Sequence, residues 1–230
     1  MMEFLRDSVF FAVALTLITY LIGLKLKKRF KLAIFNPLLI SAALIIVVML
    51  IFRIDYSVYE AGAKYINFFL TPSTVALAVP LYEQLEPLKK NWMAILLGIL
   101  AGALTSAVCV LVLAMMFGFT HEQYVTLLPK SITTAIGMGV SEELGGIVPI
   151  TVAVIAITGV LGNMMADFLC RIFKITDPIA KGIGIGSSAH AMGTARAMEI
   201  GEVEGAMSSL SIAVSGVITV FIAALFAKFY

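Results

Sequence analysis

Long apolar runs separated by short polar segments dominate the sequence. Five runs predict membrane-spanning helices, because a hydrocarbon core of about 30 Å requires about 20 consecutive apolar residues. Only the fourth run contains a charged residue, Asp167. The five predicted spans are Ser8 to Leu24, Leu32 to Phe52, Trp92 to Phe117, Ile147 to Leu169 and Ala206 to Ala227.

Three further apolar segments are short and are interrupted by proline, glycine, serine and threonine. Backbone that leaves the helix inside a bilayer must be buried in protein or line a wet cavity. We therefore predict broken or re-entrant helices at about Tyr65 to Leu85, Leu127 to Gly145 and Gly182 to Gly201. With the five spans, they predict an all-α polytopic membrane protein with about seven or eight membrane segments.

The three interrupted segments resemble one another. In each, a polar cluster ends nine residues before a glutamate, Glu83, Glu143 or Glu199. One interpretation is an inverted-repeat transporter fold, with repeats at 32–117 and 147–228 and the interrupted segment 127–145 between them, in a single domain 1–230. The alternative is that apolar segments rich in small residues look alike by composition.

The composition agrees with a membrane protein. The 230 residues are 61% apolar and 13% charged, and the mean hydropathy is +1.05. Because soluble domains carry about 25% charged residues, this composition excludes an ordinary soluble domain. The net charge of +2 gives no reason to predict a nucleic-acid partner. The two cysteines lie far from any ligand set, so neither a disulfide, a metal site nor a cofactor is predicted.

Lysine and arginine in short loops predict the orientation, because these residues are enriched in cytoplasmic loops. The five basic residues at 25–31 predict a cytoplasmic loop, and Lys89 and Lys90 are expected inside as well. The basic loop at 171–181 falls inside if the segment 127–145 enters and returns, and outside if that segment crosses. We favour re-entry. With re-entry, three glutamates are expected outside: Glu199, Glu202 and Glu204.

The stretch from Gly182 to Arg196 is the most informative candidate site. Its glycines and serines favour an unwound helix, and the restarting turn presents free backbone N–H groups to an anion. The predicted ligand-binding side chains here are Ser187, Ser188, His190, Thr194 and Arg196. The alternative is that the glycines form a packing face and that Arg196 extends to the membrane surface.

The other two interrupted segments offer hydroxyl groups and one more cation. Lys130 either pairs with a substrate carboxylate or anchors the chain at the membrane surface. The hydroxyl candidates are Ser131, Thr133 and Thr134 beside Lys130, and Thr71, Ser73 and Thr74 in the first segment. The first segment has no cation, so hydrogen bonding or helix capping is its expected role.

Asp167 has two interpretations. Arg171 lies four residues later, which favours a plain ion pair on one helix. The alternative is that Asp167 couples transport to protons or cations, as acids inside membranes often do. The sequence contains no H-E-x-x-H or G-x-S-x-G motif, so an enzyme is not predicted.

Three ordered motifs carry a resemblance to a known family. LTPSTVALAVPLY at 70–82, LPKSITTAI at 128–136 and GSSAHAMGTARAME at 186–199 are similar to the signature segments of the LrgB/CidB family. The resemblance implies a multi-pass protein of the bacterial inner membrane. Members are described as antiholin-like or holin-like regulators of murein hydrolase activity. The plastid glycolate/glycerate translocator has a similar domain, and some bacterial members are linked to pyruvate transport.

Two functions therefore remain open. The first is secondary transport of a small monocarboxylate such as pyruvate, glycolate or glycerate, with the cations neutralising the carboxylate. The second is an antiholin-like regulator of murein hydrolase export and lysis, acting through a small holin-like membrane partner. Membrane lipid and a second copy of the chain are the other expected partners. Buried cations among helix breaks favour transport, because a pure assembly protein has no use for them.

Overall fold

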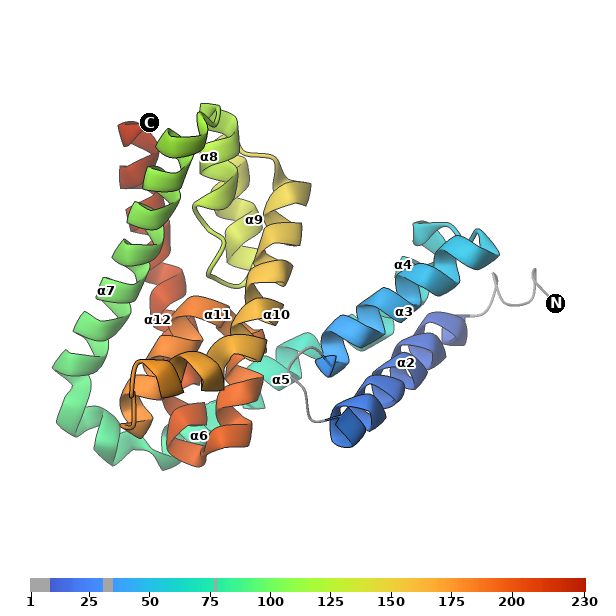
Figure 1. Cartoon of the computed structure of the whole chain (residues 1–230), viewed down its shortest axis with the longest axis horizontal. Helices are drawn as coiled ribbons and strands as arrows, with labels where there is room; N and C mark the ends of the chain where they lie inside the picture. The colour runs from blue at the N-terminus through green and yellow to red at the C-terminus, as the bar shows by residue number, and fades with distance from the viewer. Residues whose placement is uncertain (1–8, 31–34, 77) are drawn as a thin grey trace. The chain divides into compact units, whose positions relative to one another are not determined.

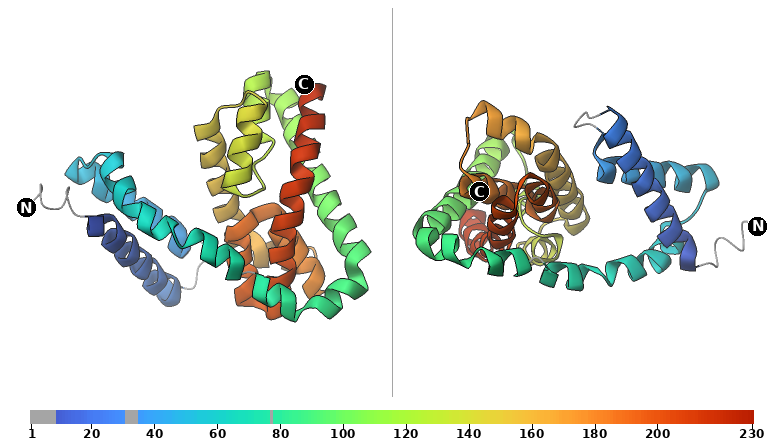
Figure 2. Two further views of the ribbon diagram at one scale, coloured as in Figure 1. Left: turned by 180° about the vertical axis from the view of Figure 1, so that it is seen from behind. Right: turned by 90° about the horizontal axis from the view of Figure 1, so that it is seen from below.

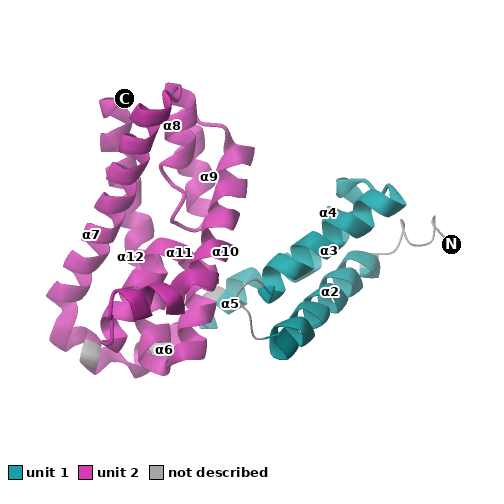
Figure 3. Ribbon diagram, in the orientation of Figure 1, with its two compact units in different colours: residues 1–76 teal, residues 77–230 magenta. Residues whose placement is uncertain are grey.

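The structure is a computed structural model that describes residues 9–30, 35–76 and 78–230. These ranges are helical and contain no strand. The chain divides into two compact units, residues 1–76 and 77–230 (Figure 3). Each unit is described by itself below, and the predicted repeat boundaries stay a prediction.

Unit 1 is built on a pair of antiparallel helices. Contacts within the pair are close, since Thr19 Oγ1 lies 2.8 Å from Ser41 Oγ and a Cβ on Gly23 would lie 2.8 Å from the Cα of Pro37. Tyr59 contacts the first of these helices through its hydroxyl group, 2.8 Å from Thr16 Oγ1. The helices of this unit are α2 (Val9–Phe30), α3 (Pro37–Phe52), α4 (Tyr56–Asn67) and α5 (Leu70–Ala76).

The second predicted span is shorter in the structure than in the sequence prediction. Helix α3 has 16 residues and begins at Pro37, because the side chain of Asn36 caps it by accepting from the backbone N–H groups of Leu38 and Leu39 at 2.9 and 3.3 Å. Residues 31–34, which include the predicted start at Leu32, lie outside the described residues. A helix of this length is shorter than the usual bilayer crossing.

Unit 2 contains the remaining helices (Figure 1). They are α6 (Ala78–Glu83), α7 (Leu85–Phe117), α8 (His121–Leu127), α9 (Thr134–Glu143), α10 (Val148–Ile172), α11 (Pro178–Ile200), α12 (Glu202–Phe226) and the 3-10 turn η2 (Ala227–Phe229). In the first predicted interruption, a turn at Phe68 and Phe69 separates α4 from α5, and Gln84 separates α6 from α7. In the described part of the chain, four helices are long and apolar enough to cross a membrane: Phe10–Phe30, Leu88–Phe117, Val148–Ile172 and Glu202–Phe229.

The chain between α7 and α10 reverses direction. Helix α8 leads inward to a turn at 128–133, and α9 leads back. Thr151 at the start of α10 contacts both, since its Oγ1 lies 2.9 Å from the carbonyl oxygen of Thr126 and 2.7 Å from Ser141 Oγ. Figures 1 and 2 show α8 and the C-terminus at the same end of unit 2. The chain thus turns back within segment 127–145, as re-entry requires, and re-entry into the membrane stays a prediction. We name α8, the turn and α9 the first hairpin.

Helix α11 also reverses, at His190. The backbone of His190 has φ 42° and ψ −139°, which is far from helical values and divides α11 into two arms. The first arm runs parallel to the start of α12, and the second runs back along it. The contacts that establish this are Gly182 with Glu204, Gly186 with Ser208, Thr194 with Ser208, and Met198 with Gly205. We name α11 the second hairpin.

This reversal corrects the expected position of the acidic group at 199–204. Lys181 Nζ lies 3.9 Å from Glu204 Oε1, so these glutamates lie at the same end of unit 2 as the basic loop. The expectation that they lie on opposite sides is wrong, because it assumed that segment 182–201 crosses the unit. The sequence predicted a broken or re-entrant helix in this segment, and the expected orientation treated the segment as crossing.

Candidate functional site

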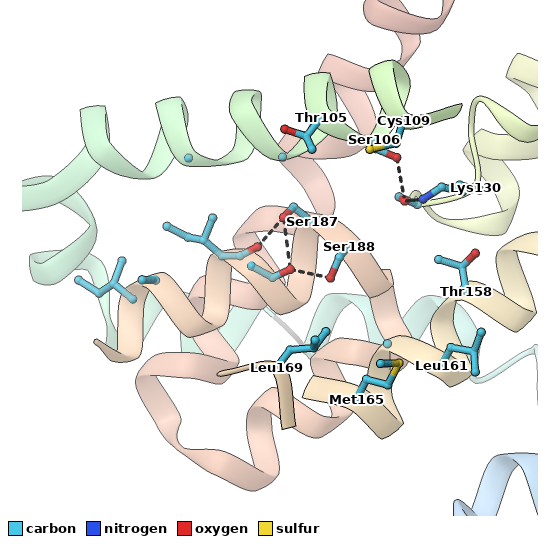
Figure 4. Close-up of a pocket in the computed structure, with 18 of the residues that line it drawn as sticks. Thr105, Ser106, Cys109, Lys130, Thr158, Leu161, Met165, Leu169, Ser187 and Ser188 are labelled. Atoms are coloured by element: carbon cyan, nitrogen blue, oxygen red, sulfur yellow. Dashed lines mark hydrogen bonds between the residues drawn. The ribbon is translucent and has the colours of Figure 1, made fainter. Parts of the chain in front are cut away.

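A cavity of about 910 Å³ lies within unit 2 between α7, α10 and the two hairpins (Figure 4). Along α7 its lining extends from Asn91 to Cys109, which at 1.5 Å per residue corresponds to about 27 Å. This is close to the thickness of a hydrocarbon core. The cavity therefore follows most of the length of one membrane-spanning helix.

Small residues on α7 create the space and also allow close packing. A Cβ on Gly98 would lie 3.5 Å from Cγ2 of Ile183, and one on Gly102 would lie 3.1 Å from Oγ of Ser187. The first arm of α11 thus packs against Gly98 and Gly102, whose spacing forms a G-x-x-x-G motif. This is the helix-packing role that such spacing favours.

Lys130 provides the single cationic side chain among the described residues that line the cavity. It lies at the turn of the first hairpin, and its Nζ donates to Ser131 Oγ at 2.9 Å. Ser131 Oγ in turn lies 3.2 Å from Ser106 Oγ of α7. Within the described chain no carboxylate pairs with Lys130. The ammonium group is therefore available to an anion in the cavity.

The second hairpin contributes hydroxyl groups to the same cavity. Ser187 and Ser188 line it, and their hydroxyls donate to the carbonyl oxygens of Ile183 and Gly184 at 2.7 and 2.6 Å. A separate void of about 10 Å³, the size of one water molecule, is also lined by Ser187 together with hydroxyls from three other elements. Those hydroxyls belong to Ser106, Ser131 and Thr219. The tips of the two hairpins thus meet beside the cavity.

His190 is not among the cavity-lining residues. Its side chain is buried, and Nε2 lies 3.0 Å from the carbonyl oxygen of Ile155 on α10. The ring also lies over Gly159, where a Cβ would be only 2.5 Å from Cε1. The structure therefore uses His190 to hold the tip of the second hairpin against α10.

Arg196 and Thr194 are likewise engaged within the fold. Arg196 is paired with Asp167 of α10 and with Glu199 of its own arm, and it does not line the cavity. Thr194 is buried, and its Oγ1 lies 3.0 Å from the carbonyl oxygen of His190 and 2.7 Å from Ser208 Oγ. Asp167 pairs with Arg196 and not with Arg171, so the predicted local pair is wrong.

One face of α10 makes these contacts. Successive positions four residues apart lie on the same face of a helix. On α10 the side chain of Asn163 donates to the carbonyl oxygen of Met192 at 2.7 Å, between the contacts to His190 and to Arg196. The positions on this face are Ile155, Gly159, Asn163 and Asp167. The second arm of α11 is thus fastened along about three turns of α10.

The remaining predicted hydroxyls belong to the first hairpin and to unit 1. Thr133 directly precedes α9, which begins at Thr134, and neither residue lines the cavity. Thr71 and Ser73 lie in α5 of unit 1 and are exposed, while the side chain of Thr74 lies outside the described residues. Of the twelve predicted ligand-binding residues, the cavity therefore brings together Lys130, Ser131, Ser187 and Ser188.

Sequence reasoning missed several polar residues of the cavity. Thr105 and Ser106 interrupt an otherwise apolar helix, and Thr158 does the same in α10. Hydroxyls at such positions are weak signals, because serine and threonine inside membrane helices also bond to their own backbone. Thr105 does so, donating to the carbonyl oxygen of Ala101 at 2.7 Å.

The cavity can accommodate a small anion. Its polar groups are the ammonium of Lys130, several hydroxyls, the amide of Asn91 and the carboxylate of Asp177, and the other lining residues are mostly apolar or small. The Asp177 carboxylate accepts from the backbone N–H of Ala180 at 2.8 Å. An ammonium group in a water-poor site attracts carboxylate strongly, and hydroxyls can donate to the remaining oxygens of the ligand. Among the described residues, no group of three or more His, Cys, Asp or Glu side chains is placed to hold a metal ion.

Comparisons with known proteins place the chain in a family. The model of the LrgB-like family matches residues 16–229. The antiholin-like protein LrgB of Bacillus mycoides (strain KBAB4) is 38% identical over 221 residues, covering 96% of each chain. The protein of the same name from Bacillus cereus (strain B4264) is 37% identical with the same coverage. No solved structure matches the chain.

These matches agree with the apolar helices of the structure and with the three sequence motifs. The matches to the family model and to the relatives extend over nearly the whole chain, so family membership applies to both units of the protein. None of the relatives named above carries the name of an enzyme. The chain belongs to the LrgB-like family and is a multi-pass protein of the bacterial inner membrane.

Proposed function

We propose that this protein is an antiholin-like regulator of lysis in the bacterial inner membrane. The supporting observation is the similarity to relatives named antiholin-like, at 37–38% identity over 96% of both chains. Such a role requires a membrane partner. A small holin-like membrane protein is the expected one, and control of murein hydrolase export is the expected output.

Deletion and complementation test this proposal. We expect that cells lacking the gene lyse earlier and release more murein hydrolase activity than the parent. The wild-type gene expressed in trans restores the parental rate, and crosslinking in intact membranes captures the protein with a small membrane partner. Unchanged lysis and unchanged hydrolase activity in the deletion strain would reject the antiholin-like role.

The cavity supports a second candidate function, the transport of a small monocarboxylate of the pyruvate, glycolate or glycerate class. Ligand pockets commonly have volumes of about 300–1,000 Å³. At 910 Å³ the cavity is far larger than a two- or three-carbon acid needs. A long cavity with one cation at one end is suited to passage of a small anion. Lys130 is the proposed carboxylate partner, with Ser131, Ser187 and Ser188 contributing polar contacts.

This proposal transfers the main role from Arg196 to Lys130. Arg196 pairs with two carboxylates, whereas Lys130 contacts only hydroxyl oxygen among the described residues. Binding a substrate at Arg196 requires breaking existing ion pairs, but binding at Lys130 does not. Asp167 stays the proposed coupling residue, since protonation of its carboxylate would release Arg196 from α10.

Uptake by proteoliposomes tests transport directly. We expect wild-type protein to accumulate labelled pyruvate, glycolate or glycerate, with a dependence on the proton gradient if Asp167 couples the two. Lys130→Met should weaken the apparent affinity at least tenfold, since charge-assisted contacts contribute about 1.5–3 kcal/mol. Lys228→Met is the matched control, because Lys228 is exposed in η2 and does not line the cavity. Equal uptake by both variants would reject the assignment.

The two candidate functions can be separated with the same variants. If lysis control depends on carboxylate movement, Lys130→Met should fail to complement the deletion strain while Lys228→Met complements it. If the antiholin-like role depends on partner assembly alone, both variants should complement equally well.

A further inference from the structure

A second pocket lies at the end of unit 2 that is predicted to face the cytoplasm. At this end α10 stops, the first arm of α11 begins and the second arm ends. Its volume is about 390 Å³. Lys181 of the first arm and Ile200 at the end of the second arm both line it, together with the last residues of α10. The pocket is separate from the large cavity, since no residue lines both. We name it the basic end pocket.

Three of its lining residues are cations, namely Arg171, Lys174 and Lys181. Arg171 and Lys174 are exposed, and neither has a carboxylate partner in the described part of the chain. The guanidinium group of Arg171 and the ammonium group of Lys174 therefore face the pocket without a compensating negative charge.

The acidic groups near the pocket are largely engaged elsewhere. Asp167 lines the pocket but pairs with Arg196, which also pairs with Glu199. Glu204 lies 3.9 Å from Lys181, at the outer limit of an ion pair, and partly compensates that lysine. The uncompensated charge of the pocket is thus positive.

Apolar side chains beside the two free cations are exposed as well. Ile172 is 54% exposed and Phe173 is 70% exposed, and both lie between Arg171 and Lys174 in the sequence. Helix α10 is one of the candidate membrane spans, so its end lies at the membrane surface. Cations next to exposed apolar groups at this level are typical of a surface that meets lipid headgroups and acyl chains together.

We propose that the basic end pocket binds the phosphate group of an anionic phospholipid headgroup. Arg171 and Lys174 donate to the phosphate oxygens, Lys181 lies at the base of the second hairpin, and the acyl chains extend along the exposed apolar face of α10. A lipid bound here contacts α10 and the start of α11 at once, and it would therefore fasten the base of the second hairpin. Free phosphate compounds share the same chemistry and are distinguished by the test.

Native mass spectrometry of the purified full-length protein tests the proposal. Detergent-solubilised protein is titrated separately with phosphatidylglycerol, phosphatidylcholine and glycerol 3-phosphate. The test variant is R171Q/K174Q. The matched control is K89Q/K90Q, which removes the same charge from exposed residues at the start of α7 that do not line the pocket. Gel filtration of each variant verifies that it is folded.

We expect wild type and K89Q/K90Q to retain one phosphatidylglycerol more tightly than phosphatidylcholine. In R171Q/K174Q this binding should weaken about thirty-fold, since each basic residue near an anionic surface contributes about fivefold. If R171Q/K174Q loses glycerol 3-phosphate binding to the same extent as phosphatidylglycerol binding, the phosphate site is supported. Its ligand would then be a soluble phosphate compound. Equal retention of both ligands by all three proteins, or equal loss in the two double variants, would overturn the proposal.

Discussion

The imidazole Nε2 of His190 lies 3.0 Å from the backbone carbonyl oxygen of Ile155, at the point where α11 reverses direction. A positive φ is unfavourable for residues other than glycine and persists only where surrounding contacts maintain it. Here those contacts come from α10. The strained backbone, the buried ring and the adjacent Gly159 together fix the tip of the second hairpin.

The first prediction tests this attachment with Gly159→Ala. The added Cβ would lie 2.5 Å from Cε1 and 2.7 Å from Nε2 of His190, so the hairpin tip must move. We expect the free energy of unfolding to fall by about 1–3 kcal/mol, as for other overpacked sites. Gly139→Ala is the control, because a Cβ there meets nothing within 4 Å. Thermal unfolding in detergent should show Gly139→Ala at or above wild type and Gly159→Ala below it.

A second prediction concerns the pair of Arg196 and Asp167. Both side chains are partly exposed, so the pair should contribute no more than about 1 kcal/mol. We expect a double-mutant cycle of Arg196→Gln and Asp167→Asn to give a coupling energy of that size. The double variant should also keep the wild-type apparent affinity for carboxylate, because neither residue lines the cavity.

The same double variant also tests coupling. If Asp167 couples transport to protons, uptake by the double variant should no longer depend on the proton gradient. The apparent affinity of the double variant for carboxylate should stay unchanged. A large loss of affinity would instead return the substrate contact to Arg196.

The contrast between Arg196 and Lys130 shows what the sequence could and could not predict. Both are cations in interrupted segments, and the sequence offers both as candidate partners of a substrate carboxylate. What decides their roles is the presence of a carboxylate nearby, and Asp167 lies 29 residues before Arg196 in the chain. Only the reversal at His190 brings them together. No local pattern indicates that reversal, since histidine is not a residue that favours positive φ as glycine does.

Periodicity and small residues were better guides to the fold. Four of the five predicted spans appear as helices long enough to cross a membrane, and all three predicted interruptions contain helix breaks. The exception is α3, where Asn36 and Pro37 start the helix later than hydropathy alone suggests. The packing role of Gly98 and Gly102 could also be predicted, because close helix approach needs small residues at that spacing.

A third prediction uses Cys109 as a reporter of the charge in the large cavity. Cys109 is exposed and lines the cavity, as Lys130 does. In a Cys170→Ala background, a negatively charged methanethiosulfonate should modify Cys109 faster than a positively charged one. We expect Lys130→Met to reduce the ratio of the two rates roughly tenfold, because a nearby charge concentrates ions of opposite sign. Lys228→Met should leave the ratio unchanged, and an unchanged ratio in both variants would contradict a cationic cavity.

A fourth prediction concerns sidedness. Asn91 of α7 and Asp177 before α11 line the same cavity, and Lys89 and Lys174 lie close to them in sequence. The positive-inside rule places both lysines in the cytoplasm. With both native cysteines replaced, Lys89→Cys and Lys174→Cys should react with a membrane-impermeant maleimide only in inside-out vesicles. Glu143→Cys, at the end of α9, should react from the outside. Labelling of Lys89→Cys and Lys174→Cys from different sides would exclude this topology.

The last prediction separates the stability of the basic end pocket from its binding. Lys174 adopts φ 52° just after α10, where helices usually place glycine. Left-handed backbone costs other residues about 1 kcal/mol, so Lys174→Gly should be more stable than Lys174→Gln by about that amount. Both variants lose the same charge and should lose the same share of phosphatidylglycerol binding. Thermal unfolding and native mass spectrometry measure the two quantities independently. If binding followed stability, so that Lys174→Gly retained the lipid and Lys174→Gln lost it, the lysine would act through the fold and not through its charge.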